Sequence, residues 1–345
     1  RQALVGALAG RLNHRKMLVT GLLVMIGVSA VLAALSKTGH IQLWHIAVGV
    51  FVSGMFWVLD YSVRKTLLGA VVDGGSVGHA MSLDTVSNNG TRMLGPILGG
   101  MFLQWVGLTG VYVFAAVGYI GAILCALALS STIGRSEQKG RGVISAIGQS
   151  LPLLKSHPLL AGILMVTVVF NLWGFPFISM IPVIGKEILV LNSFYVGLLM
   201  SAEGCGALIG ALLIAGTGQS RHYRKLYICG LGLYLVMAIV FSQSTSSVVS
   251  GSCLLVVGLG VAAFAAMQST LILLTAPEQA RSLMMGLLTM CIGMAPIGFL
   301  HIGLLADWLG APTAIAILAA EGLVALWWVL RRWPSLWDLQ YRSAE

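Results

Sequence analysis

Charged side chains are scarce in this 345-residue sequence, where Asp, Glu, Lys and Arg together make up only 9% of the residues. A soluble domain carries about 25% charge. Hydrophobic residues make up 58% of the chain and its mean hydropathy is +0.94, so polar groups are too few to cover the apolar surface. The composition excludes a soluble globular protein and indicates that lipid surrounds the helices.

Motifs for direct chemistry are also missing from the sequence. It has no phosphate-binding loop, no nucleophile elbow and no His/Cys spacing typical of a metal site. The five cysteines lie singly inside apolar runs, so we predict neither a disulfide nor a metal cluster. We therefore expect no enzyme activity, no metal and no cofactor.

Apolar stretches of about 20 residues, each long enough to span the hydrocarbon core as a helix, recur along the chain. Ten can be marked, approximately at 17–35, 41–63, 81–106, 109–129, 158–181, 193–217, 226–241, 247–274, 283–306 and 311–330. Four precede the long connection 130–157 and six follow it. The predicted fold is an all-α membrane protein with ten transmembrane helices divided four plus six.

The basic residues alternate between connections. Seventeen of the 20 Lys and Arg residues fall in every second connection, Arg92 lies inside a run, and only Lys37 and Lys186 lie in the other connections. This positive-inside pattern predicts a multi-pass protein of the inner membrane with both ends of the chain in the cytoplasm. No loop combines basic and aromatic residues on one surface, so the net charge of +9 does not predict a nucleic-acid partner.

Two segments of the chain resemble each other, as the halves of many transporters do. Gly95-Pro96 followed by Trp105-Val106-Gly107 recurs as Ala295-Pro296 followed by Trp308-Leu309-Gly310. The offsets are 200 and 203 residues. The shared order and spacing favour two related halves.

Two motifs resemble those of the major facilitator superfamily. The opening segment, with Gly6, Arg11, Arg15 and Lys16, resembles the signature between the family's second and third spans, although Gly10 stands where the family usually has Asp. The segment Gly90-Thr-Arg92-Met-Leu-Gly95-Pro96-Ile-Leu-Gly99-Gly100 resembles the glycine-proline motif in span five of the family's exporters. We expect Pro96 to bend this helix, and Gly95 and Gly99 to form its tight packing face.

The resemblance to this superfamily implies how the chain is divided. Family spans three to twelve would be present and the first two missing, which would remove part of the cavity wall. The expected parts are an N-terminal half at 1–129, a cytoplasmic linker with an amphipathic helix at 130–157, a six-helix half at 158–330 and a cytoplasmic tail at 331–345.

Three local matches, at 56–68, 92–96 and 195–202, resemble the branch that includes macrolide and enterobactin exporters. This resemblance implies proton-coupled efflux of a hydrophobic drug-like or siderophore-like small molecule by alternating access, in a monomeric protein. A non-transporting scaffold or receptor on the same fold, an importer and a lipid transporter remain alternatives.

Ionised side chains at mid-membrane cost about 2.5 to 3.5 kcal/mol each, so they need a partner or a role. Arg92 lies 11 residues into its run and Glu203 lies 10 residues into a run that enters from the other side. At 1.5 Å per residue they reach depths of about 16 Å and about 15 Å. We expect a proton-coupled Arg92–Glu203 interaction beside the substrate path. The alternatives are a static ion pair and a Glu203 that burial keeps neutral.

Further polar residues lie in the apolar runs. Asp84, with Asn88, suits a proton site near the cytoplasmic mouth, but an acid in a first helical turn also stabilises the helix dipole. Asn171 interrupts its run and either lines a cavity or belongs to a kinked core. Glu321 on the last run suits a scaffold or oligomer contact, and we interpret His301 as an interfacial side chain.

Overall fold

The computed structural model describes residues 14–71, 77–128, 153–154, 156–217, 222–277 and 280–337. These residues are almost entirely helical, and none of them forms a strand. Contacts divide the chain into two compact units. The N-terminal unit holds Arg1–Asn88 and Met101–Gly142, and the C-terminal unit holds Asn89–Gly100 and Val143–Glu345.

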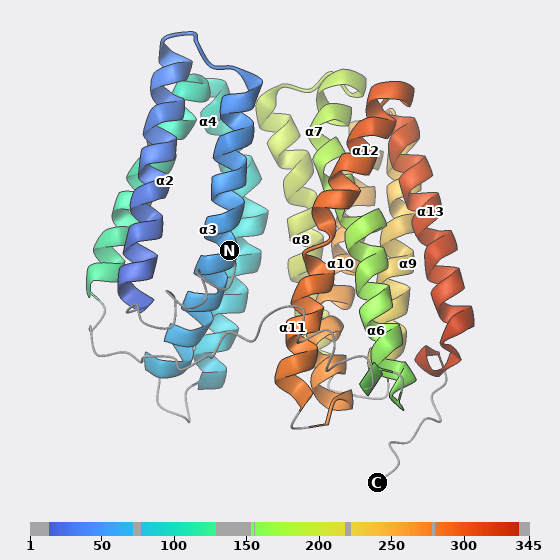
Figure 1. Ribbon diagram of the computed structural model, residues 1–345. Helices are drawn as coiled ribbons and strands as arrows, with labels where there is room; N and C mark the ends of the chain where they lie inside the picture. The colour runs from blue at the N-terminus through green and yellow to red at the C-terminus, as the bar shows by residue number, and fades with distance from the viewer. Residues whose placement is uncertain are drawn as a thin grey trace. The chain divides into compact units, whose positions relative to one another are not determined.

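The N-terminal unit is built from α2 (His14–Lys37), α3 (Leu43–Val71) and the parts of α4 (Val77–Ala128) on either side of Asn89–Gly100. Helices α2 and α3 pack directly against each other (Figure 1). One hydrogen bond joins the hydroxyls of Thr109 and Ser36, 2.9 Å apart. Such a bond satisfies two polar groups that lipid would leave without partners.

Gly107 divides α4 into two helical runs. Its φ of 70° and ψ of −176° are not helical and lie in a region that essentially only glycine adopts. Gly310 has a similar conformation, with φ 80° and ψ 157°, between α12 (Ala295–Leu309) and α13 (Ala311–Arg332). The two Trp-x-Gly sequences that resemble each other therefore form the same kind of helix–helix turn.

The C-terminal unit contains the remaining helices (Figure 1). In chain order they are α6 (Pro158–Val169), η2 (Phe170–Gly174), η3 (Phe175–Met180), α7 (Ile181–Val183), η4 (Ile184–Ile188), α8 (Ser193–Thr217), α9 (Tyr223–Ser242), α10 (Ser247–Thr275), α11 (Arg281–Ile292), α12, α13 and η7 (Pro334–Leu336). Among these, α10 packs against both α8 and α9, and α13 packs against α9.

The run Pro158–Ile188 is not a regular α-helix. It passes from α6 into a π-helical turn at η2 and then a 3-10 turn at η3. Pro176 has no N–H to donate to the carbonyl of Leu172, four residues earlier. That carbonyl lies only 2.3 Å from where a Cβ would stand on Gly298, so α12 approaches the broken helix through a glycine.

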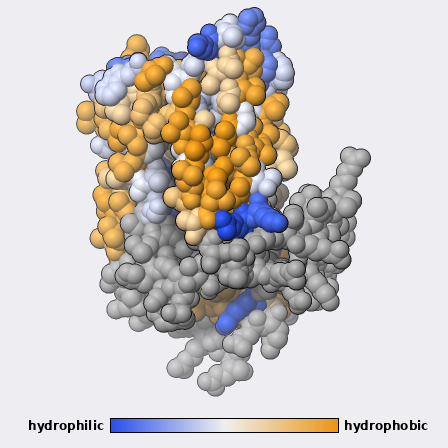
Figure 2. Space-filling view, turned by 90° about the vertical axis from the view of Figure 1, so that its left-hand side faces the viewer, coloured by the Kyte–Doolittle hydropathy of each residue, from blue (hydrophilic) through white to orange (hydrophobic). Residues whose placement is uncertain are grey.

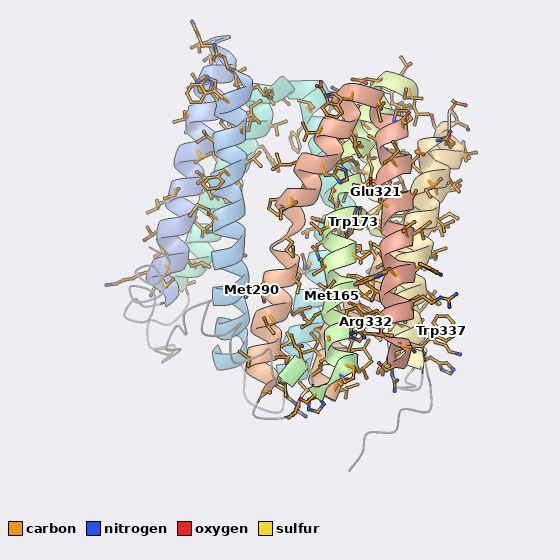
Figure 3. All side chains as sticks on the ribbon, turned by 45° about the vertical axis from the view of Figure 1, so that its right-hand side comes forward. Met165, Trp173, Met290, Glu321, Arg332 and Trp337 are labelled. Carbon is orange, nitrogen blue, oxygen red and sulfur yellow. The ribbon has the colours of Figure 1, made fainter. Side chains whose placement is uncertain are left out.

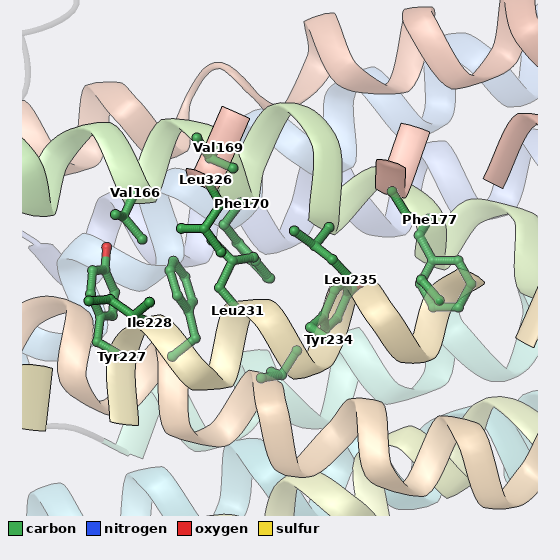
Figure 4. Close-up of a cluster of buried hydrophobic side chains, with 14 of the residues drawn as sticks. Val166, Val169, Phe170, Phe177, Tyr227, Ile228, Leu231, Tyr234, Leu235 and Leu326 are labelled. Atoms are coloured by element: carbon green, nitrogen blue, oxygen red, sulfur yellow. The ribbon is translucent and has the colours of Figure 1, made fainter. Parts of the chain in front are cut away.

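Buried aliphatic and aromatic side chains together fill the core of the C-terminal unit (Figure 4). Phe264 stacks on Phe170 and on Tyr227, with ring centroids 4.2 Å and 4.8 Å apart. The Tyr227 hydroxyl lies 2.8 Å from the hydroxyl of Thr167, which also accepts a hydrogen bond of 3.1 Å from the amide of Gln268. The hydroxyls of Thr167 and Tyr227 and the amide of Gln268 are thus paired with one another within the core.

Eight helical stretches among the described residues are long and apolar enough to cross a membrane. One of them, Gly90–Ala128, contains the Gly107 turn, and Leu43–Phe56 is a shorter apolar helix. The count of ten spans and its division into four plus six therefore remain predictions. Figure 2 shows one face on which the described surface is largely apolar, with hydrophilic residues toward its edges, as expected for helices in contact with lipid.

Candidate functional site

Arg92 and Glu203 form an ion pair within the C-terminal unit. Arg92 lies in the Asn89–Gly100 segment of α4 and Glu203 lies in α8. The guanidinium Nη2 donates to the carboxylate Oε1 at 2.6 Å. The Glu203 side chain is 4% exposed and that of Arg92 is 35% exposed. The structure thus brings together two residues whose positions in the apolar runs predict a similar depth in the membrane.

Glycines allow the backbones of α4 and α8 to approach closely around this pair. A Cβ on Gly197 would lie 2.2 Å from the carbonyl oxygen of Pro96, and one on Gly204 would lie 2.7 Å from the Cα of Met93. A Cβ on Gly100 would lie 2.3 Å from the carbonyl oxygen of Ser193. Only glycine fits at these positions, so helix packing places Arg92 within reach of Glu203.

The contact of α4 with α8 uses a face defined by Pro96 and Gly100. Apart from the neighbouring backbone of α4 itself, no described atom lies within 4 Å of the Cβ position of Gly90, Gly95 or Gly99. One residue turns a helix by about 100°, so Gly95 and Gly99 lie on another face than the one that contacts α8. That Gly95 and Gly99 form a second tight packing face stays a prediction.

Helix α10 closes the other side of Glu203. A Cβ on Gly258 would lie 2.0 Å from the carbonyl oxygen of Glu203, and one on Gly206 would lie 1.9 Å from that of Leu255. Close backbone packing on both sides leaves little room for water near the carboxylate. Removing a carboxylate from water costs several kcal/mol, which a well-formed ion pair offsets.

An apolar cavity of about 430 Å³ lies beside the ion pair. Met93 and Ala202, the chain neighbours of Arg92 and Glu203, both line it. The hydroxyl of Ser201, another lining residue, donates to the carbonyl of Gly197 at 2.9 Å and so is already satisfied. The other lining residues are Leu94, Ile97, Leu191, Tyr195, Leu198, Leu199, Cys205, Ser247, Gly251 and Leu255. The cavity has the size and lining of a site for a mainly apolar small molecule.

The structure does not place Asp84 or Asn88 relative to this site, and Asn171 is not among the residues that line its cavity. The backbone of Asp84 is helical, but its side chain lies outside the described residues. Asn88 is exposed and belongs to the N-terminal unit. Asn171 is 4% exposed, and its amide donates to the Thr167 carbonyl at 2.9 Å, which fits the interpretation as kinked core packing.

The opening motif is described only in part. Gly6 and Arg11 lie outside the described residues, whereas Arg15 and Lys16 begin α2. The guanidinium of Arg15 donates to the carbonyl of Leu127. This bond ties the start of α2 to the end of α4 within the N-terminal unit.

Sequence reasoning missed a second polar cluster in the C-terminal unit. The indole nitrogen of Trp173 donates to the Glu321 carboxylate at 3.0 Å, and Nδ1 of His301 lies 3.6 Å from the same oxygen. The three residues come from η2, α12 and α13, and Figure 3 shows Trp173 and Glu321 close together. No signal in the sequence linked the three residues, because nothing in the spacing relates their runs.

Comparison with known proteins gives matches along most of the chain. The family described as "Transmembrane secretion effector" (MFS_3) matches residues 2–338. A "Multi-drug resistance efflux pump PmrA homolog" of Lactococcus lactis subsp. lactis (strain IL1403) is 21% identical over 224 residues, covering 64% of this chain and 55% of the relative.

A second relative is the MFS-type transporter y4rN of Sinorhizobium fredii (strain NBRC 101917 / NGR234). It is 26% identical over 164 residues, which cover 46% of this chain and 40% of that protein. The chain thus spans about half the length of the curated relatives it matches.

Solved structures share the fold. The inward-facing, unoccupied form of a bacterial homolog of the human lysosomal transporter Spinster has a TM-score of 0.72 at 11% identity, covering 99% of this chain and 87% of that one. A D-xylose-proton symporter has a TM-score of 0.71 at 13% identity, with 97% and 85% covered. At such low identity the likeness shows the fold alone.

Proposed function

Since this chain belongs to the transmembrane secretion effector family of the major facilitator superfamily, we propose that it exports a hydrophobic small molecule in exchange for protons. The family model identifies the chain as a multi-pass membrane protein of a transporter family, which is not a family of enzymes. Transport of a small molecule by this chain, its direction, the coupling ion and the substrate class are the parts that we propose.

The observation that carries the proposal is a buried ion pair next to an apolar cavity. An ionised residue in a membrane span is costly and tends to mark a substrate or proton pathway. Here Glu203 and Arg92 meet at 2.6 Å, and their chain neighbours line a cavity of about 430 Å³. A substrate in this cavity and a proton on Glu203 would therefore both act on α4 and α8.

Coupling follows from what protonation does to the pair. A proton on Glu203 removes its charge and leaves Arg92 without an anionic partner, so a conformation that exposes Arg92 more fully to water becomes relatively more stable. A change of about 1.4 kcal/mol between two conformations shifts their population ratio tenfold. The loss of one buried ion pair is large enough to bias inward against outward opening.

The substrate class and direction rest on the cavity and on the family. A volume of about 430 Å³ lies in the range of sites for drug-sized ligands, and the lining is mostly aliphatic. The relative described as a multi-drug resistance efflux pump supports export of such compounds. A siderophore-like substrate would need additional polar groups in the cavity wall.

The test is retention of ethidium, a lipophilic cation, by cells that express the full-length gene product, with and without a proton uncoupler. Glu203→Gln keeps the shape of the side chain and removes the titratable charge. Glu187→Gln is the matched control, because it makes the same change at an exposed position. We expect wild type and the control to lower retained ethidium, Glu203→Gln to lower it much less, and the uncoupler to abolish the difference.

Each part of the proposal has its own contrary result. Export by Glu203→Gln equal to wild type across pH would remove the coupling role. Efflux that persists with the uncoupler would remove the proton as the driving ion. Ethidium that rises above the level of cells lacking the protein would reverse the direction.

A further inference from the structure

Basic and aromatic side chains gather where α13 ends and α9 begins. Helices α13 and α9 are both candidate membrane spans, and they pack against each other. The span of α13 ends at Arg332, and the span of α9 begins at Tyr223. The guanidinium of Arg224 donates to the carbonyl of Ser335 at 3.0 Å, which holds η7 against the start of α9. The cluster therefore lies at one membrane–water interface, in a fixed local structure.

Three cations in this cluster lie over indole rings. Arg331 is 5.3 Å from the Trp327 ring centroid and Arg332 is 5.4 Å from that of Trp333. The Lys225 ammonium is 6.0 Å from the centroid of Trp337. Figure 3 shows Arg332 and Trp337 at this end of α13. We call Lys225, Arg331, Arg332 and the tryptophans 327, 333 and 337 the interfacial cluster.

The interfacial cluster contains a cavity of about 400 Å³. Its walls are Trp327, Leu330, Arg331, Pro334 and Trp337, so one cation lies among apolar side chains. Within the described chain, the Arg331 guanidinium contacts the Trp327 ring and no hydrogen-bond acceptor. Asp338, next in sequence, lies outside the described residues. A ligand that fits here needs an anionic group for Arg331 and an apolar portion for the walls.

We propose that this cavity binds an anionic phospholipid of the surrounding leaflet. A guanidinium suits a phosphodiester because it can donate two parallel hydrogen bonds. Lys225 and Arg332 add positive charge beside the headgroup. The glycerol region and an acyl chain would follow the exposed side of α13, where Trp327 and Val324 are 58% and 65% exposed. This apolar continuation favours a lipid over a soluble phosphate.

The positive-inside rule explains cations at this end of the spans but not their arrangement. Topology requires only charge, which long basic side chains deliver equally well when fully solvated. Here Arg331 shares a defined cavity with two indoles instead. The proposed site depends on neither the substrate nor the coupling ion, so its failure would leave the transport proposal untouched.

The test uses the purified full-length protein in nanodiscs of phosphatidylcholine that contain a photoreactive analogue of either phosphatidylglycerol or phosphatidylcholine. The crosslinked peptides are then identified by mass spectrometry. We expect several-fold more crosslinking to residues 327–337 with the phosphatidylglycerol analogue. Arg331→Gln should lower it about fivefold, the effect of one basic side chain near an anionic surface. Arg331→Lys, which keeps the charge, should lower it less.

Arg281→Gln is the matched control, since it removes one exposed positive charge at the start of α11, away from the cavity. It should leave crosslinking at 327–337 unchanged. Equal labelling by the two analogues, or an equal loss in Arg281→Gln, would overturn the proposal in favour of a non-specific charge effect. Protection by inorganic phosphate as complete as by phosphatidylglycerol would also overturn it, because a soluble anion would then suffice.

Discussion

The packing of α4 on α8 can be tested by one methyl group placed at two adjacent positions. Gly99 and Gly100 are neighbours in the same helix, and alanine at either should gain up to about 1 kcal/mol in helix propensity. They differ in what the new Cβ meets. At Gly99 no described atom beyond the neighbouring backbone of α4 lies within 4 Å, whereas at Gly100 the carbonyl oxygen of Ser193 would be 2.3 Å away.

The magnitude follows from that distance. Ordinary contacts of a Cβ begin at 3.4 Å, so Gly100→Ala forces α4 and α8 apart by about 1 Å. The obstacle is backbone, which cannot rotate away as a side chain can. Overpacking of this kind costs about 1 to 3 kcal/mol. Separating the helices also strains the Arg92–Glu203 hydrogen bond, now 2.6 Å long.

The assay compares the thermal unfolding midpoint of both variants in detergent with that of wild type, and then their export of ethidium. Gly99→Ala should match or exceed the wild-type midpoint and keep activity. Gly100→Ala should unfold at a lower temperature and lose most of its export. If the two variants behave alike, or if Gly99→Ala is the more damaging, the contact face described for α4 is incorrect.

Three further changes test the site and the fold, each measured by thermal unfolding in detergent. Arg92→Met leaves the 4% exposed Glu203 without its cation, and the free energy of unfolding should fall by about 3 to 5 kcal/mol. The double variant with Glu203→Met should recover much of this loss. No recovery would argue against direct pairing. Gly310→Ala should cost about 1 to 3 kcal/mol because its φ is 80°, while Gly303→Ala, where no described atom lies nearby, should not destabilise. Phe264→Ala removes the ring between Phe170 and Tyr227 and should cost about 3 to 5 kcal/mol; a neutral result would show that the core repacks.

Several features of the site could be predicted from the sequence. The depths of Arg92 and Glu203 follow from their positions in apolar runs, because helical rise is constant. The repeated Trp-x-Gly sequences favoured two related halves, and the structure adds that Gly107 and Gly310 both have positive φ. The break near Asn171 and Pro176 was also visible, since proline removes a backbone donor.

Other features could not be read from the sequence. The motif drew attention to Gly95 and Gly99, and nothing in it showed that α4 contacts α8 through Pro96 and Gly100. Likewise, the Glu321 carboxylate meets Trp173, which lies 148 residues earlier in the chain, and His301 of the preceding helix. Their runs are apolar on all sides, so no amphipathic pattern shows which side chains face each other.

By itself, the sequence determined that this is a membrane protein, because a chain with only 9% charged residues has too few polar groups to remain folded in water. It also predicted the depth of each ionised side chain from its position along an apolar run, at 1.5 Å per residue. The tertiary structure alone decided how each helix is rotated about its axis. In lipid that rotation is set by the fit of small residues such as Gly100, Gly197 and Gly204 against neighbouring backbones, and that fit exists only once the helices meet.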